Sequence, residues 1–204
     1  FGEYLTPSVV SIGKNQEVFV GSVAKEMLAT QPYDTFREFK RNMGTNFLYG
    51  NGRKKYRAEE LSAFVLRRLK EDAEKFLGEE VTEAVISVPA YFDDNKRNAT
   101  KNAGRLAGLK VERLINEPSA VALKHHTAEK GAESFIVFDF GGGTLDVSLV
   151  EAFDNVVEIQ AVAGDNYLGG KDFNEIIAQD FYEQNQISEA YLTKNEQENV
   201  LKEA

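Results

Sequence analysis

Residues 138–146 read Phe-Asp-Phe-Gly-Gly-Gly-Thr-Leu-Asp, and this stretch says more about the chain than any other. A strand-like apolar run ends near Asp139, just before the three glycines. A second strand-like run begins after Thr144 and contains Asp146. Because glycine has no Cβ atom, we expect the loop to adopt positive φ angles and to bring bare N–H groups close to an anion. Aspartate oxygens suit a hydrated Mg²⁺ ion. The stretch therefore predicts a loop between two strands that grips a nucleotide polyphosphate.

Two familiar phosphate-binding loops are excluded by their patterns. The sequence contains no G-x-x-x-x-G-K-[ST] segment and no G-x-G-x-x-G segment that opens a helix. The alternative for the triple glycine is an ordinary hairpin turn without a ligand. Asp139 and Asp146 favour the ligand interpretation, because a plain hairpin does not require acids on both sides.

The composition is that of a globular protein with a negative surface. The chain has 204 residues, of which 42% are hydrophobic and 28% charged, and its net charge is -9. This charge disfavours non-specific binding to nucleic acid or to anionic membranes, so we expect neither as a partner. The absence of cysteine excludes a disulfide scaffold, a thiolate metal site and a catalytic thiol. It is compatible with a reducing cytoplasm, where we expect the protein to act.

The first half of the chain has the pattern of a mixed α/β structure. In order, it predicts strands at residues 9–12 and 18–20, a helix at 22–29 capped by Ser22, a short helix at 35–43 and a long helix at 58–77. The long helix has one apolar stripe, made of Leu61, Val65, Leu69, Ala73 and Phe76. A buried strand at 84–88, a helix from Asp93 or Asp94 to 107, a strand at 110–115 and a helix from 118 to about 125 follow. This alternation predicts a parallel sheet.

The second half has a different order. Three strands are expected in succession, at residues 135–139, 145–151 and 156–163. A helix at 171–183 and an acidic, helical stretch from residue 187 follow. The residues alone thus predict two mixed α/β layers with the Gly-rich turn facing a cleft.

Four separate motifs resemble the ATPase domain of the seventy-kilodalton heat-shock chaperone (DnaK-type) family. They are Val-Pro-Ala-Tyr-Phe at 88–92, Ile-Asn-Glu-Pro-Ser-Ala at 115–120, the Gly-rich stretch at 139–146, and Ala-Gly-Asp through Leu-Gly-Gly at 163–170. They stand in the order of the family and at its approximate spacing. Residues 3–12 and 66–73 are most similar to the bacterial HscC branch. The resemblance covers essentially the whole chain.

This resemblance implies an actin-like ATPase fold with ribonuclease H-like cores, in which two lobes clasp Mg·ATP. Residues 1–128 would belong to the first lobe, with an upper subdomain at 9–61 and a base at 62–128. Residues 129–204 would begin the second lobe, with its base at 129–168 and its upper subdomain from 169 to 204.

The resemblance also implies roles for single residues. The phosphates would be held by Lys40, Gly141, Gly142, Gly143, Thr144, Gly169 and Gly170. Catalytic roles would fall to Lys40, Glu117, Asp139, Thr144 and Asp146, with Asp139 holding Mg²⁺ through water. A relay of nucleotide state would use Pro89, Arg97, Arg113 and Asn116. The implied partners are a J-domain co-chaperone, a nucleotide exchange factor and unfolded peptide clients, the last through a domain that this sequence does not contain.

The chain also departs from the family pattern. The first phosphate loop of the family, an Asp-Leu-Gly-Thr-Thr hairpin, and its final adenosine turn do not occur in the sequence. We therefore expect a partial two-lobe domain that binds Mg·ATP weakly by itself and does not hydrolyse it. Two alternatives remain: a non-catalytic binding module on the actin-like fold, and a sugar or acetate kinase of the same superfamily.

Overall fold

The computed structural model describes residues 5–50, 54–125, 131–153 and 156–204. These residues form a mixed α/β structure with three sheets, which confirms the predicted α/β class. The boundary between lobes expected at residue 128 lies outside the described residues. Within the described ranges, no helix combines the length and the apolar character needed to cross a bilayer.

The first sheet is antiparallel, with β1 (Val9–Ile12) between β2 (Val18–Val20) and β3 (Thr35–Arg37). Helix α1 (Ser22–Thr30) lies against β1. The two predicted strands and the first helix are confirmed, although Gly21, with a φ of 82°, occupies the cap position expected for Ser22. All four residues of β1 are buried, so this strand is the centre of the layer.

The helix predicted at residues 35–43 is wrong in its first half. Residues 35–37 pair with β1, and the buried Thr35 Oγ1 donates a hydrogen bond of 2.9 Å to Ser11 Oγ. Glu38 then takes a left-handed φ of 58°, and only Phe39–Asn42 form a short 3-10 helix, η1. Strand pairing with a segment far back in the chain thus overrides the local helical pattern.

The long helix α2 (Ala58–Leu77) has the predicted bounds, and Gly78 ends it in the left-handed conformation. Its apolar stripe is buried only at the start, since Leu61 is 0% exposed whereas Leu69 is 44% and Phe76 80% exposed. Leu61 belongs to one hydrophobic cluster that joins β1, η1 and α2 to the next strand and helix.

The predicted parallel unit is confirmed. Strand β4 (Glu83–Val88) pairs in parallel with β5 (Lys110–Asn116), and the elements that follow these strands are α3 (Asp94–Leu106) and α4 (Glu117–His125). The expected full burial of residues 84–88 is wrong, because exposure alternates along β4 and Val85 is 59% exposed. One face of this sheet is therefore open to solvent.

The three predicted strands of the second half form an antiparallel meander. They are β6 (Glu133–Phe140), β7 (Leu145–Phe153) and β8 (Val156–Asp165), and β7 lies in the middle. Helix α5 (Gly170–Gln184) follows, as predicted. The acidic stretch forms a 3-10 turn, η3 (Glu189–Tyr191), and then α6 (Lys194–Glu203), which begins later than expected because the Thr193 side chain caps it.

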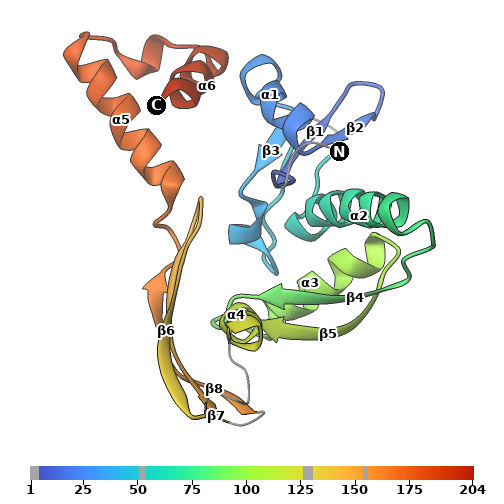
Figure 1. Cartoon of the computed structure of the whole chain (residues 1–204). Helices are drawn as coiled ribbons and strands as arrows, with labels where there is room; N and C mark the ends of the chain where they lie inside the picture. The colour runs from blue at the N-terminus through green and yellow to red at the C-terminus, as the bar shows by residue number, and fades with distance from the viewer. Residues whose placement is uncertain (1–4, 51–53, 126–130, 154–155) are drawn as a thin grey trace.

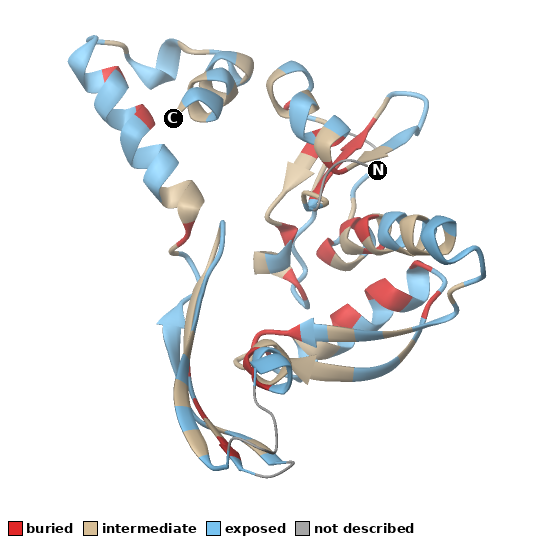
Figure 2. Cartoon of the chain, in the orientation of Figure 1, coloured by how far each residue is buried: buried red, intermediate tan, exposed pale blue. Residues whose placement is uncertain are grey.

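Figure 1 shows the two halves side by side, with the elements from β1 to β5 on one side and β6–β8, α5 and α6 on the other. Helix α4 contacts strands of both sides, namely β4, β5, β7 and β8. At the opposite end α6 lies against α1. Buried residues are concentrated in the first half, whereas the second half is largely exposed (Figure 2). A pocket lies between the halves and is lined by residues of both, among them Lys40 and Thr144.

The uneven burial of α2 predicts an uneven cost of truncation. We expect Leu61→Ala to lower the free energy of unfolding by about 2–5 kcal/mol, because it leaves a cavity in the core. The matched change Leu69→Ala, in the same stripe but half exposed, is expected to cost about 1 kcal/mol or less. Urea unfolding followed by circular dichroism measures both, and equal costs would contradict the burial pattern of α2.

Candidate functional site

The Gly-rich loop connects β6 to β7 and touches the start of α5. The Gly141 N–H donates to the carbonyl of Thr144 at 3.0 Å and closes the turn. The carbonyls of Gly141 and Gly142 accept hydrogen bonds of 3.0 Å from the N–H groups of Gly170 and Lys171. The loop thereby satisfies N–H groups in the first turn of α5, which have no partner inside the helix.

The carbonyls of the loop have hydrogen-bond partners, but within the described part of the chain most of its N–H groups do not. Among the described residues, those of Gly142, Gly143 and Thr144 have no hydrogen-bond acceptor. All three residues line a pocket of about 580 Å³ between the two halves. Several unsatisfied N–H groups at one concave surface are the arrangement that binds anions.

Close approach of another segment accounts for some of these glycines, and a special backbone conformation accounts for none of the three in the loop. The expected positive φ angles are wrong, since none of Gly141, Gly142 and Gly143 is among the residues with positive φ. A Cβ atom on Gly169 would lie 2.3 Å from the nitrogen of Gly143, so the two segments touch main chain to main chain. A Cβ atom on Gly142 would meet nothing within 4 Å, and it would project into open space that a ligand can fill.

Most of the residues predicted for phosphate binding and catalysis lie around this pocket. Its lining includes Lys40, Glu117, Asp139, Gly141, Gly142, Gly143, Thr144 and Gly170. Gly169 is buried behind the loop, and Asp146 is not part of the lining. A second hollow of about 810 Å³ lies beside it, between α4 and β6, and shares Asp139 with it.

Asp139 and Asp146 occupy directly opposite positions of β6 and β7. Their side chains therefore share one face of the sheet, where like charges repel. Burial raises the pKa of Asp146, and the carboxylates of Glu117 and Asp139 raise it further, against the opposing effects of the Thr144 hydroxyl and Lys40. Such a pair suits a cation.

The donor set fits a hydrated cation better than a directly bound one. Among the described residues, no group of three or more His, Cys, Asp or Glu side chains is arranged to hold a metal ion. Mg²⁺ loses its water reluctantly and is often held by one or two carboxylates. The two aspartates meet that requirement.

Lys40 and Glu117 form an ion pair of 2.8 Å across the pocket. Lys40 lies in η1 and remains 53% exposed, whereas Glu117 begins α4 and is 21% exposed. Residues 77 positions apart thus bring opposite charges together beside the acidic pair. The lysine has an accessible ammonium group, as a phosphate ligand requires.

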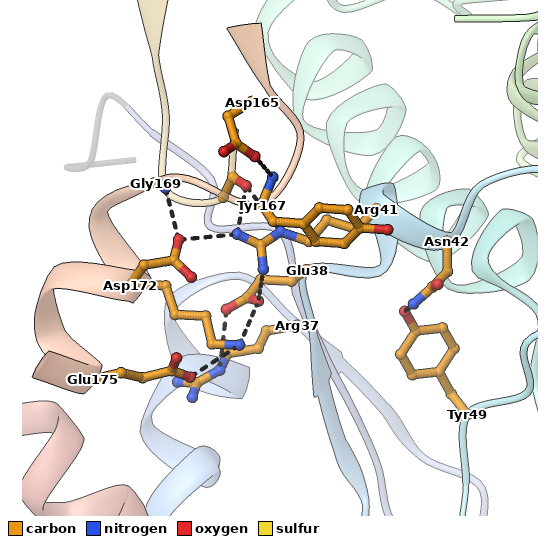
Figure 3. Close-up of polar contacts among 12 residues, drawn as sticks. Arg37, Glu38, Arg41, Asn42, Tyr49, Asp165, Tyr167, Gly169, Asp172 and Glu175 are labelled. Atoms are coloured by element: carbon orange, nitrogen blue, oxygen red, sulfur yellow. Dashed lines mark hydrogen bonds and ion pairs between the residues drawn. The ribbon is translucent and has the colours of Figure 1, made fainter. Parts of the chain in front are cut away.

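Arg41 is a site residue that the sequence did not reveal. Its Nε donates to the Gly143 carbonyl at 2.9 Å, Nη2 donates to the same oxygen, and Nη2 lies 3.2 Å from Asp172 Oδ2 (Figure 3). The guanidinium carbon lies 5.9 Å from the centre of the Tyr167 ring. Its partners are 102 and 131 residues away in the chain, so no local pattern could identify them.

Tyr91 is a second residue without an expected site role. It lines the pocket, and burial, with the nearby charges of Asp146 and Glu117, raises its pKa to about 12, although Arg41 opposes the rise. Lys96 lies 5.3 Å from the centres of both the Tyr91 and Phe92 rings. The tyrosine is therefore neutral at ordinary pH and can donate a hydrogen bond.

Three of the four predicted relay residues lie together. The Arg97 guanidinium donates to Asn116 Oδ1 at 2.7 Å and to the Phe92 carbonyl at 2.8 Å, and Pro89 is fully buried in the adjoining turn. Arg113 is exposed on β5, opposite Val85, and has no contact with the other three among the described residues. The geometry thus links Arg97 to the residue before Glu117.

Comparison with known families adds one finding. A family model described as Hsp70 protein matches residues 1–51 and 48–203. The match covers both halves of the chain, including the Gly-rich loop and the residues of the pocket.

The contacts of the glycines predict opposite tolerance at two positions. We expect Gly169→Ala to destabilise the fold by about 1–3 kcal/mol, since its Cβ would collide with the main chain of the loop. Gly142→Ala is expected to leave the free energy of unfolding almost unchanged, because nothing lies within 4 Å. Thermal unfolding of the two variants tests this difference, and equal melting temperatures would show that the loop and residue 169 do not touch as described.

The charges around Asp146 predict a coupled titration. Glu117→Gln removes a carboxylate that raises the pKa of Asp146, so this pKa should fall towards its ordinary value of 3.8. Because the folded state holds the proton more tightly, Asp146 stabilises the fold below pH 3.8, and this stabilisation is lost as the pH rises through the raised pKa.

Carboxyl NMR titration measures the shift directly. Glu175→Gln, which removes a carboxylate on α5 that does not affect Asp146, is the control and should leave the pKa where it is. An unchanged pKa in Glu117→Gln would mean that Glu117 does not face Asp146.

Proposed function

Since the chain belongs to the Hsp70 protein family, we propose that it forms part of a domain that binds and hydrolyses ATP to drive the peptide-binding cycle of a molecular chaperone. The observation that carries the proposal is the pocket between the halves. There, three N–H groups that have no acceptor among the described residues converge with Asp139 and an exposed lysine, and Asp146 lies opposite Asp139 in the sheet.

The chemistry of this donor set matches a magnesium nucleotide. The N–H groups of Gly142, Gly143 and Thr144 would hold the β- and γ-phosphates, as a nest of main-chain amides does. Lys40 would add positive charge next to the peripheral oxygens of the γ-phosphate, where charge gathers in phosphoryl transfer. Mg²⁺, when bound, neutralises phosphate charge, and Asp139 would hold it through water.

Glu117 and Asp146 would orient the attacking water. Burial raises the pKa of Asp146, and the carboxylates of Glu117 and Asp139 raise it further, so a nearby cation would favour its ionised form. The ion pair with Lys40 holds Glu117 at the pocket side of α4. Gly169 and Gly170 would support the phosphate loop from the second lobe.

The finer identity of the chain follows from its resemblance. We place residues 1–128 in the first lobe and residues 129–204 in the second lobe of an actin-like ATPase, of the HscC branch and acting in the cytoplasm. Pro89, Arg97, Arg113 and Asn116 would relay the nucleotide state. A J-domain co-chaperone, a nucleotide exchange factor and unfolded peptides would be its partners.

Removal of the proposed ligands tests the activity in the full-length protein. Asp139→Asn and Thr144→Ala should each lower the rate of ATP hydrolysis by about a hundredfold or more. The first removes the carboxylate that would hold Mg²⁺ through water, and the second removes the Thr144 hydroxyl that hydrogen-bonds Asp146, while the main-chain N–H of residue 144 remains. Single-turnover release of phosphate measures the rate, and circular dichroism reports the fold.

Asp180→Asn on the exposed side of α5 is the control for loss of a carboxylate and should hydrolyse ATP normally. Unchanged turnover in both site variants would show that this pocket is not where ATP is hydrolysed. No hydrolysis by the unmodified full-length protein would eliminate the ATPase and favour a non-catalytic binding module. ADP release that depends on an added small acceptor would instead favour a sugar or acetate kinase.

A further inference from the structure

Every carbonyl of the Gly-rich loop between Gly141 and Gly143 is held by a donor from another element. The Gly141 and Gly142 carbonyls accept from the N–H groups of Gly170 and Lys171. The Gly143 carbonyl accepts instead from a side chain, the guanidinium of Arg41. Two donors thus belong to α5, and the third comes from the other half of the chain.

These three contacts determine where the N–H groups point. A trans peptide is planar, and its C=O and N–H bonds point in opposite directions. A donor that holds the carbonyl of one residue therefore directs the N–H of the next residue to the other side. By this geometry α5 orients the N–H groups of Gly142 and Gly143, and Arg41 orients that of Thr144.

Arg41 is itself anchored from both halves. Asp172 Oδ2 lies 3.2 Å from its Nη2 and also accepts a hydrogen bond of 2.7 Å from the Gly169 N–H. Glu38 lies 3.8 Å from Nη1, and it also contacts Lys171 at 3.2 Å and Arg37 at 3.6 Å (Figure 3). The side chain of Arg41 is only 16% exposed, so the guanidinium is well shielded from water.

Other contacts join the halves without touching the loop. Arg37 and Glu198 form an ion pair of 3.2 Å between β3 and α6. Lys194 donates to the Pro32 carbonyl at 2.8 Å, and Asn195 donates to the Ala29 carbonyl at 2.9 Å. They provide a comparison, because they hold the halves together but do not contact the peptide of Gly143 directly.

We propose that Arg41 is a positioning residue that completes the phosphate loop: it turns the Gly143–Thr144 peptide so that all three N–H groups face the pocket, and it does so only while the two halves are closed. Separation of the halves withdraws the guanidinium and frees one peptide of the loop. That these N–H groups receive a phosphate rests on the proposed function, whereas their orientation by Arg41 does not.

The test uses the whole 204-residue chain without nucleotide, labelled with ¹⁵N for NMR. In Arg41→Ala the Thr144 amide resonance should move, and hydrogen exchange at the Gly170 and Lys171 amides should accelerate by at least about tenfold, since loss of a charge-assisted hydrogen bond loosens the loop. Arg41→Lys should restore part of the protection, because an ammonium group can reach one acceptor but cannot bridge both.

Asp172→Asn and Glu198→Gln form a matched pair of controls. Each removes the carboxylate partner of an arginine at the joint between the halves, but Asp172 contacts Arg41 directly, whereas Glu198 is linked to it only through Arg37 and Glu38. We expect Asp172→Asn to accelerate exchange at Gly170 and Lys171 and Glu198→Gln to leave it unchanged. Equal effects of the two, or loop resonances of Arg41→Ala that match the wild type, would overturn the proposal.

The outcome remains decisive if Arg41→Ala does not fold, because Arg41→Lys and Asp172→Asn then carry the test. The result is also separable from the proposed function. Altered loop amides in Arg41→Ala, together with no ATP hydrolysis by the unmodified full-length protein, would refute the ATPase and leave the positioning role of Arg41 intact.

Discussion

The structure depends on hydrogen bonds between main-chain groups at the place where β6, β7 and α5 meet. Carbonyls of the Gly141–Gly143 loop accept hydrogen bonds from N–H groups at the start of α5, so the helix and the hairpin are fixed to each other. The N–H groups of Gly142, Gly143 and Thr144 then have no acceptor among the described residues, and these residues line the pocket between the halves. One local arrangement thus both builds the joint of the second half and creates its anion-binding surface.

The sequence was informative where structure is local. Helix α2 has the predicted bounds because its periodic apolar residues and Gly78 define a helix without outside help. The meander β6–β8 was predictable for the same reason, since each strand pairs with its neighbour in the chain. The segment 35–43 was mispredicted because Thr35 pairs with Ser11, 24 residues away, and a local pattern contains nothing of that contact.

The candidate site divides in a similar way. The glycines and the two aspartates lie within one hairpin, so their proximity could be predicted, and their register brings the acids face to face. The roles of Lys40 and Glu117 were implied by the resemblance alone and remain predictions, and the ion pair between them was not predicted. Arg41 and Tyr91 were missed because their importance arises from partners that only the folded chain brings near.

Helix α5 also has a mechanical consequence. Its first turn is hydrogen-bonded to the loop, and Gly169 before it leaves no free space. With 15 residues the helix is about 22 Å long, so a tilt of about 10° about that end would move the far end by about 4 Å and the loop by much less. A large displacement of the distal end of α5, near the place where α6 contacts α1, would therefore shift the peptides at the pocket only slightly.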